Sequence, residues 1–240
     1  LAGLLLPALA SAKAKARQTQ CINNLKQLGL GMMMYLNDSN DAFPNMASAA
    51  QGWQPDDWIF WRQNDSANPK DLLQNSMIVS ELTTGSTTNL FRCPADINNK
   101  WRISQGSAAY WYSYSLNGLG VISSVDHGMG SSLGEASFKA GSILNPGDKI
   151  LLAEEPATPW GQGGSDAPPA GVPVQANGTT YTLPVTSLDD GRWEAFHSGN
   201  PNNTLTVRHR GKADLNFGDG HVETQLFTYA LDPAHVDALK

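Results

Sequence analysis

The sequence predicts an α+β protein in which one long N-terminal helix precedes a globular head with an antiparallel β-sheet and long loops. Three observations lead to this class. The chain opens with an apolar run that continues as a helical repeat, a cluster of helix-stopping residues follows, and the remainder alternates short apolar segments with turns rich in Gly and Pro. We therefore expect a helix over residues 1–36 and a head over residues 37–240.

The N-terminal segment is purely apolar over residues 1–10 and amphipathic after that. Apolar side chains recur every three or four positions at Ile22, Leu25, Leu28 or Gly29, Met32 and Leu36. Pro7 is expected to bend or locally open the helix, because it lacks an N–H donor. The run Asn37–Asp41 is a strong stop signal. A bilayer span needs about 20 apolar residues, so we interpret the opening run as the back half of a longer apolar segment.

The formal net charge of −6 is unevenly distributed. Residues 1–40 contain four cations (Lys13, Lys15, Arg17 and Lys26) and one anion (Asp38), a net +3, which leaves −9 for the other 200 residues. An acidic head disfavours nucleic acid as the main partner. The basic segment fits a chain that leaves a membrane with its cations near the head groups, and it equally fits a solvated helix face.

The two cysteines, Cys21 and Cys93, form no CxxC or Cys/His motif, which disfavours zinc ribbons and attached haem. In an exported protein two such cysteines usually pair, whereas in a cytosolic one they would be reduced core residues. We predict the Cys21–Cys93 disulfide, which would fix the N-terminal helix to the head.

Residues 1–35, including the run Cys21–Gly29, resemble the N-terminal helix of type IV pilins and type II secretion pseudopilins. The family's processed start is missing, so its assembly glutamate maps onto no residue here. His209, nine further residues and then Asp219-Gly220 resemble the signature of a bacterial pseudopilin subgroup. The runs Phe91–Asp96 and Ile150–Glu154 are also similar to that subgroup.

The resemblance implies a structural subunit of a cell-surface filament, exported through the inner membrane and partnered by copies of itself. The helix would be buried among those copies through Leu1, Leu4, Leu5, Leu6, Pro7 and Leu9. One alternative is a minor pseudopilin of a type II secretion system. Another is a secreted carbohydrate-binding or adhesive module that uses Trp53, Trp58 and Trp61 on a surface glycan, although core packing is the commoner use of Trp. An enzyme is not expected, because the sequence contains no catalytic motif.

Two turn signals predict a three-stranded antiparallel meander over residues 204–227. A three-residue loop at Gly211–Ala213 and a two-residue loop at Asp219-Gly220 would place Phe217 opposite both Val207 and Val222. The inward-facing residues would be Leu205, Val207, Leu215, Phe217 and Val222. His209 and Asp219 would then lie about 15 Å apart. We interpret the signature as a folding device rather than a catalytic or metal pair.

The rest of the head gives weaker signals. A short helix is expected over residues 71–82, strands over 110–116 and 149–153, and a long surface loop over 156–187. No cofactor is expected. Calcium is a weak candidate through Asp189, Asp190 and Glu154, although no Asp-x-Asp-x-Asp-Gly spacing is present.

Overall fold

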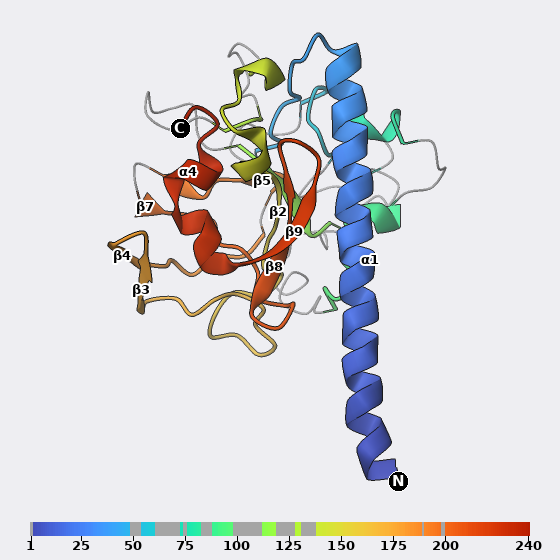
Figure 1. Cartoon of the computed structure of the whole chain (residues 1–240), viewed down its shortest axis with the longest axis vertical. Helices are drawn as coiled ribbons and strands as arrows, with labels where there is room; N and C mark the ends of the chain where they lie inside the picture. Colours follow the sequence, from blue (N-terminus) through green and yellow to red (C-terminus); the bar gives the residue numbers. More distant parts are fainter. Residues whose placement is uncertain are drawn as a thin grey trace.

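The computed structural model describes residues 2–48, 54–60, 73, 76–82, 88–97, 112–118, 128–130, 138–188, 190–197 and 200–240. It confirms the predicted fold class. A long helix, α1, stands along one side of a β-rich head, and its N-terminal end extends well beyond the head (Figure 1).

Helix α1 spans Ala2–Asp38 without interruption. Pro7 lies inside it, and the backbone there stays helical, so the predicted locally opened turn is not present. The missing N–H costs only the hydrogen bond to the carbonyl of Gly3, near the start of the helix. The predicted stop operates through Asn40 and Asp41, which both adopt positive φ angles, 53° and 60°. Short polar side chains tolerate this conformation, and it ends the helix.

The main sheet has five strands in the order β5-β1-β2-β8-β9. Neighbours among β1, β2, β8 and β9 are antiparallel, and β5 pairs in parallel with β1 at one edge. These strands span Tyr114–Asn117 (β1), Ile150–Glu154 (β2), Arg192–Trp193 (β5), Lys212–Phe217 (β8) and Val222–Leu226 (β9). Two hairpins stand apart from the sheet: β3 (Pro173–Ala176) with β4 (Thr179–Thr182), and β6 (Phe196–His197) with β7 (Asn200–Pro201).

Short helical turns complete the described part of the chain. Helix α4 spans Pro233–Val236, and its N-cap Asp232 accepts a hydrogen bond from the Ala234 N–H. The 3-10 helices span Met77–Val79, Thr88–Phe91, Ala140–Ser142, Pro146–Asp148 and Phe227–Leu231. Of the helix predicted over 71–82, residues 71, 72, 74 and 75 lie outside the described residues, and the described remainder contains the 3-10 helix Met77–Val79 and no α-helix. Of the strand predicted over 110–116, residues 110 and 111 lie outside the described residues, and β1 covers Tyr114–Asn117. The predicted loop over 156–187 carries the β3–β4 hairpin.

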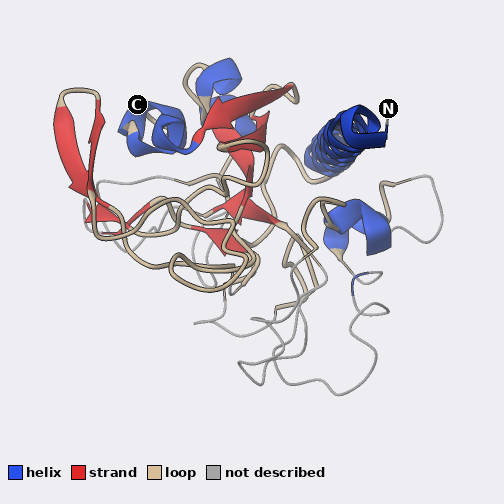
Figure 2. Cartoon of the chain, turned by 90° about the horizontal axis from the view of Figure 1, so that it is seen from below, coloured by secondary structure: helices blue, strands red, loops and turns tan. Residues whose placement is uncertain are grey.

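Two apolar cores lie on opposite faces of the sheet. One packs α1 against the sheet through Leu25, Leu28 and Met32, with Leu151 and Leu152 of β2. The other, beyond the sheet, contains Ile150, Ala153, Trp193, Ala213, Leu215 and Phe217. Alternation along β8 places Asp214 and Asn216 on the helix side. In Figure 2, α1 is seen nearly end-on beside the sheet.

Close approach of helix and sheet requires a glycine. A Cβ placed on Gly29 would lie 2.4 Å from Nδ2 of Asn216 on β8. Real Cβ atoms do not come this close to another heavy atom, so a larger residue at position 29 would require the Asn216 side chain or α1 itself to move.

The predicted meander over 204–227 is wrong in its first strand. β8 pairs with β2 on one side and β9 on the other, and residues 204–207 form no strand. Those residues bond instead to a loop and a strand end, since Thr206 N donates to Glu154 O at 2.9 Å and Val207 N to Asp166 O at 2.7 Å. The apolar strand β2 gains more burial in the centre of the sheet than the more polar segment 204–207 would.

The β8–β9 hairpin is also one position longer than predicted. Val222 pairs with Asn216 rather than with Phe217, and the Phe217 N–H donates to His221 O at 3.0 Å. The loop is therefore Gly218–Gly220, with Gly220 at φ 89°. A type I turn followed by a left-handed glycine gives this three-residue connection. Asp219 and Gly220 still occupy the tip.

Candidate functional site: the stem and its junction with the head

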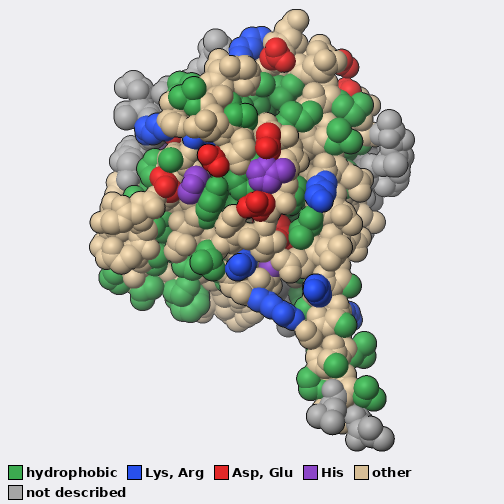
Figure 3. Space-filling view, in the orientation of Figure 1, with side chains coloured by type: hydrophobic (Ala, Val, Ile, Leu, Met, Phe, Trp, Pro, Cys, Tyr) green, Lys and Arg blue, Asp and Glu red, His purple; other side chains and the backbone are tan. Residues whose placement is uncertain are grey.

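The projecting half of α1, which we call the stem (residues 2–16), offers apolar side chains to solvent. Leu5, Leu6 and Leu9 are 66%, 68% and 67% exposed, whereas Leu25 and Leu28 higher on the same helix are 0% exposed. Figure 3 shows green side chains along the stem below the head. Leu1 and the side chain of Leu4 lie outside the described residues. Within the part of α1 that is described, no segment is long and apolar enough to cross a membrane.

The predicted disulfide is present. Cys21 on α1 is bonded to Cys93, which follows the 3-10 helix Thr88–Phe91, and the two Cα atoms are 4.8 Å apart. Both side chains are fully buried. Asn24, one turn further along α1, donates from Nδ2 to the carbonyl of Arg92 at 2.9 Å. The helix is thus fastened to the head by one covalent bond and by polar contacts beside it.

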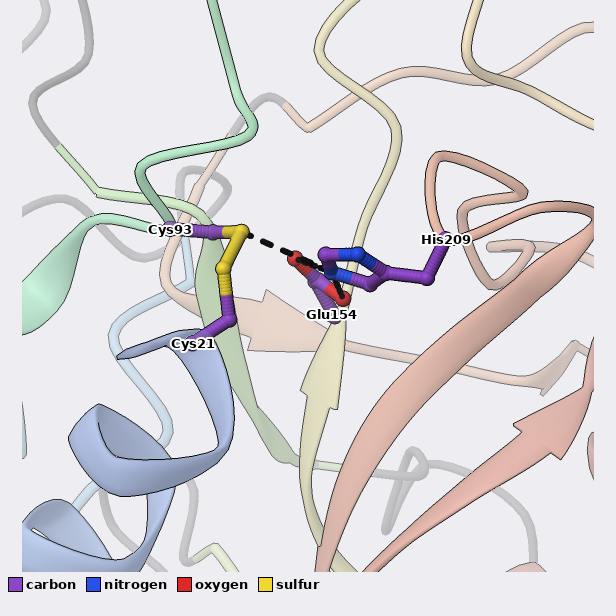
Figure 4. A group of neighbouring side chains, drawn as sticks. All are labelled: Cys21, Cys93, Glu154 and His209. Atoms are coloured by element: carbon purple, nitrogen blue, oxygen red, sulfur yellow. Dashed lines mark hydrogen bonds and ion pairs between the residues drawn. A yellow bond between two sulfur atoms is a disulfide. The ribbon is translucent and has the colours of Figure 1, made fainter. Parts of the chain in front are cut away.

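A buried ionic cluster lies next to the disulfide (Figure 4). We call it the junction cluster, and it comprises Asp96, Glu154, Asp166, Arg208, His209 and Asp214. Its centre is Glu154, which ends the apolar strand β2 and is 0% exposed. Oε1 accepts from Arg208 at 3.0 Å, and Oε2 lies 3.0 Å from His209 Nε2 and 3.1 Å from the Asp214 backbone nitrogen.

These contacts keep Glu154 ionised inside the protein. Burial by itself would raise the pKa of its carboxyl, but the Arg208 charge and the hydrogen bonds from His209 and the Asp214 N–H lower the pKa below the ordinary value. Burial also opposes the positive charge of Arg208, yet Asp166, Glu154 and Asp96 raise the pKa of its guanidinium. Both groups therefore stay charged although their side chains are almost completely buried.

Arg208 connects three segments that are far apart in the sequence. Its Nε and Nη2 donate to Asp166 Oδ2 at 2.9 and 2.7 Å, and Nη2 also donates to the Glu155 carbonyl at 2.5 Å. Asp96 lies 3.9 Å from Nη1. A planar guanidinium with five donors suits such a multiply bonded position, which a lysine could not fill.

His209 faces three acceptors with one ring nitrogen. Its Nε2 lies 3.0 Å from Glu154 Oε2, 3.3 Å from Asp214 Oδ2 and 3.5 Å from the Cys93 sulfur. Burial works against the imidazolium, but the hydrogen bond and charge of Glu154, together with Asp214, raise the pKa of His209. The pKa of Asp214 is raised too, by burial and then by the nearby Glu154 charge.

The cluster also holds α1. Gln18 donates from Nε2 to Asp214 Oδ1 at 3.2 Å and to Thr224 Oγ1 at 3.3 Å, while Thr224 donates to the same Asp214 oxygen at 2.6 Å. From strand β1, the Tyr114 hydroxyl donates to the carbonyl of Cys21 on α1 at 3.4 Å. The residues just above the stem are thus tied to β1, β8 and β9 as well as to the disulfide.

Metal binding is not favoured at this cluster in its disulfide form. One ligand atom each from Cys21, Cys93, Glu154 and His209 lies within 4.8 Å of the others. However, the two sulfurs are bonded to each other and offer no thiolate, which leaves only two ligands. Of the calcium candidates, Glu154 belongs to this grouping but Asp190 does not, and Asp190 Oδ1 accepts from the Arg192 N–H at 2.8 Å. Asp189 lies outside the described residues.

The two halves of the His–Asp-Gly signature have different partners. Asp219 pairs with His221 at the hairpin tip, at 2.5 Å, and no ion pair between Asp219 and His209 occurs among the described residues. His209 precedes β8 and Asp219 follows it, so the six residues of that strand, about 20 Å, separate them. Asp219 and Gly220 therefore shape a turn, while His209 belongs to the junction cluster.

Trp58 has the core role that the sequence favoured, and not the surface role of the carbohydrate-binding alternative. This side chain is 0% exposed, and its Nε1 donates to the Gly191 carbonyl at 2.8 Å. Trp53 and Trp61 lie outside the described residues. Trp58 is a core residue.

The sequence motifs singled out above meet in space at the junction cluster. The runs Phe91–Asp96 and Ile150–Glu154 and the signature residue His209 lie far apart in the chain, yet they surround one buried site. The sequence analysis did not identify Asp166 and Asp214 as members of this cluster. For Asp214, a carboxylate between Ala213 and Leu215 in a strand with an apolar period was a usable signal, because a charge on a buried strand requires a partner.

The fold and site thus define a class of α+β protein whose long helix is half fastened to a β-rich head and half projecting. Residues 10–140 match the family model described as "Protein of unknown function (DUF1559)", and the chain belongs to this family. No curated protein and no solved structure matches the chain.

Proposed function

We propose that this chain is the structural subunit of an extracellular type IV pilin-like filament that self-assembles through its N-terminal helix. The observation that carries the proposal is the stem. A helix that is firmly held by the head over one half projects three leucines, each about two-thirds exposed, over the other half.

The energetics favour association of such stems. Full burial of one leucine side chain contributes roughly 1.5–3 kcal/mol, and several leucines on each copy would be buried together in a bundle of stems. The entropy of association opposes this gain. The DUF1559 family is also associated with pilin-like proteins, which agrees with a filament role.

The junction cluster and the disulfide have a mechanical role in this proposal. A filament held together by its stems transmits pulling forces from head to stem through the contacts between them. The Cys21–Cys93 bond and the Gln18 contacts lie where the stem meets the head. On this proposal the cluster is structural rather than catalytic, and copies of the same chain are the main partner.

Assembly is tested by negative-stain imaging and sedimentation of the purified chain. Leu5→Ser with Leu9→Ser should abolish fibres. A matched control, Leu144→Ser with Val185→Ser, removes apolar side chains that are 52% and 64% exposed on the head, and should leave fibres intact. A wild-type chain that stays monomeric at all concentrations, or fibres that survive the stem substitutions, would contradict the proposal.

Two alternatives give different outcomes. A minor pseudopilin would join fibres of another subunit without forming long ones itself. An adhesive module would bind glycans as isolated particles. A pocket of about 260 Å³ beside β9, lined by Asn177, Gln225, Tyr229, Asp232 and His235 among others, combines an aromatic ring with polar groups as sugar sites do. A glycan array with Tyr229→Ala as the comparison separates this alternative from the filament.

A further inference from the structure

Four side chains of metal-binding type meet where α1 is fastened to the head. Cys21 comes from α1, Cys93 from the segment after the 3-10 helix Thr88–Phe91, Glu154 from the end of β2, and His209 from the turn before β8. One ligand atom from each of them lies within 4.8 Å of the other three. Figure 4 shows the imidazole and the carboxylate directed toward the sulfur atoms. The fold therefore brings together two sulfurs, one nitrogen and one oxygen from four separate segments.

The electron-rich atoms around His209 Nε2 outnumber the single proton that this nitrogen can carry. Nε2 lies 3.0 Å from Glu154 Oε2, 3.3 Å from Asp214 Oδ2 and 3.5 Å from the Cys93 sulfur. One ring N–H can donate a well-aligned hydrogen bond to only one of these atoms. Lone pairs of oxygen, nitrogen and sulfur that converge in this way are arranged as the ligands of a cation are.

The distances between these atoms suit the bond lengths of zinc. Zinc binds cysteine sulfur at about 2.3 Å and histidine nitrogen at about 2.0–2.1 Å, in tetrahedral geometry. Such bonds place a sulfur ligand and a nitrogen ligand about 3.5 Å apart, and the Cys93 sulfur and His209 Nε2 already have a separation of 3.5 Å. His209 Nε2 and Glu154 Oε2, at 3.0 Å, would need to separate by only about 0.3 Å.

The disulfide is what keeps these four side chains from binding a metal, because zinc binds thiolates and the two sulfurs are bonded to each other. A phosphine breaks this bond: it supplies two electrons and takes an oxygen atom from water, and each cysteine gains a proton. The freed sulfurs repel each other at bonding distance and move apart, as a tetrahedral site requires. Zinc then displaces both thiol protons to solvent, and the proton on Nε2 leaves that nitrogen because its lone pair binds the metal.

The surroundings of the four side chains orient them and exclude water. Arg208 donates to Glu154 Oε1 at 3.0 Å, and the Asp214 backbone N–H donates to Oε2 at 3.1 Å. Outer-shell hydrogen bonds of this kind typically change metal affinity by about 10–100-fold. All four ligand side chains are buried. A closed site with four protein ligands is typical of structural zinc, whereas catalytic zinc keeps an open position.

We propose that the chain with both cysteines reduced binds one zinc ion through Cys21, Cys93, Glu154 and His209. The ion fastens α1 to the head in the dithiol form, as the disulfide does in the oxidised form. Every chain is synthesised with free thiols, so the dithiol form precedes the disulfide. Oxidised glutathione accepts two electrons from the two thiolates, which form the protein disulfide, yield two glutathione thiolates and release the zinc. The zinc site does not depend on filament formation.

Metal binding is tested on the full chain, reduced with a phosphine and kept free of oxygen. Cobalt(II) is the spectroscopic probe, because its visible absorption reports tetrahedral geometry and its sulfur charge-transfer band reports thiolate ligands. We expect one cobalt per chain with both signals, displacement by one equivalent of zinc, and release of the zinc by oxidised glutathione. The disulfide form of the same chain should show neither signal. A reduced chain that binds no cobalt, or binds it without the thiolate band, would overturn the proposal.

His209→Gln tests whether the ligand set extends beyond the two sulfurs. The reduced variant should bind zinc more than about 100-fold more weakly than the reduced wild type, beyond the range for loss of an outer-shell partner. His197→Gln, which replaces a histidine whose side chain is 62% exposed, is the matched control and should keep the wild-type affinity. Circular dichroism of the disulfide form checks that His209→Gln folds. Wild-type affinity in His209→Gln would show binding by the thiols alone and would overturn the four-residue site.

A stability measurement on the wild-type chain needs no substitution in the site. Zinc should raise the urea midpoint of the reduced chain toward that of the disulfide form, because a ligand that binds the folded state stabilises it. Zinc should leave the midpoint of Cys21→Ala with Cys93→Ala unchanged. A midpoint of the reduced wild-type chain that does not rise with zinc would contradict the site, as would an equal rise in the double variant.

Discussion

Glu154 is the residue on which the junction cluster depends. It accepts from Arg208, His209 and the Asp214 backbone while fully buried. Such a carboxylate is tolerated because each oxygen has a cationic or N–H partner. Removing its charge leaves Arg208 and His209 buried with too few anions.

We expect Glu154→Gln to lower the free energy of unfolding by about 3–5 kcal/mol, the range for breaking one partner of a buried ion pair. Urea denaturation, followed by circular dichroism, measures this change in the free energy of unfolding. Glu223→Gln, whose side chain is 55% exposed, is the control and should change stability by less than about 0.5 kcal/mol. Similar losses in the two variants would show that the cluster contributes little.

His209 makes stability depend on pH with a definite sign. Its folded-state pKa is raised above the ordinary 6.5 by Glu154 and Asp214, against burial and Arg208. A raised pKa means that the folded state binds the proton more tightly than the unfolded state. The contribution is therefore complete below pH 6.5 and is lost as the pH rises through the folded-state pKa.

We expect the unfolding free energy of the wild-type chain to fall as the pH increases above 6.5, and the fall to be smaller in His209→Gln. Urea midpoints at a series of pH values measure the slope. His197→Gln replaces a histidine whose side chain is 62% exposed and should retain the wild-type slope. A slope that is identical in wild type and His209→Gln would show that another group titrates.

At the scale of elements, α1 and β8 fit together through a glycine. The approach of Gly29 to Asn216 leaves no room for a methyl group. Gly29→Ala should therefore destabilise the protein by about 1–3 kcal/mol, as overpacking does, despite the better helix propensity of alanine.

Gly3 is the matched control for this substitution. It lies on the same helix, and a Cβ there would meet nothing within 4 Å. Gly3→Ala should be neutral or slightly stabilising, since alanine favours the helix. Thermal unfolding of the two variants gives the comparison, and an equal effect would mean that the helix–sheet contact relaxes around the added methyl group.

The disulfide fastens α1 to the head across a separation of 72 residues. In the chain-entropy model, a loop of this length stabilises by about 4 kcal/mol. Cys21→Ala with Cys93→Ala should cost about that amount in urea unfolding. Reductant should destabilise the wild-type chain similarly and leave the variant unaffected. A reductant effect on the variant would mean that the readout does not report this bond.

Helix, stop and strand positions were largely predictable because each depends on nearby residues. The 3.6-residue period of α1 and the polar run after it are local signals, as is the apolar run of β2. Pairing was not. Residues 204–209 have an alternating pattern like that of a strand, yet β2 occupies the place beside β8, and no local signal distinguishes the two neighbours.

In the molecule as a whole, the head and the stem depend on each other very little before Ser11. Leu5, Leu6 and Leu9 are exposed, and among the described residues the first hydrogen bond between the stem and the head joins Ser11 to Arg210. A chain that begins at Ala10 should unfold with a free energy within about 0.5 kcal/mol of the full chain. Its sedimentation should be that of a monomer. A large loss of stability would mean that the stem supports the head.

The long helix and its end, the cysteine pair, the apolar stem and the excess of acidic residues in the head could be predicted without a structure, because they follow from composition and from short-range periods. The packing of the complete fold was needed to find that Asp96, Glu154, Arg208 and His209 meet beside the disulfide, that β2 lies between β1 and β8, and that Arg210 reaches the stem. Each buried charge requires a partner, and the chain supplies those partners from segments whose proximity depends on how all the elements pack.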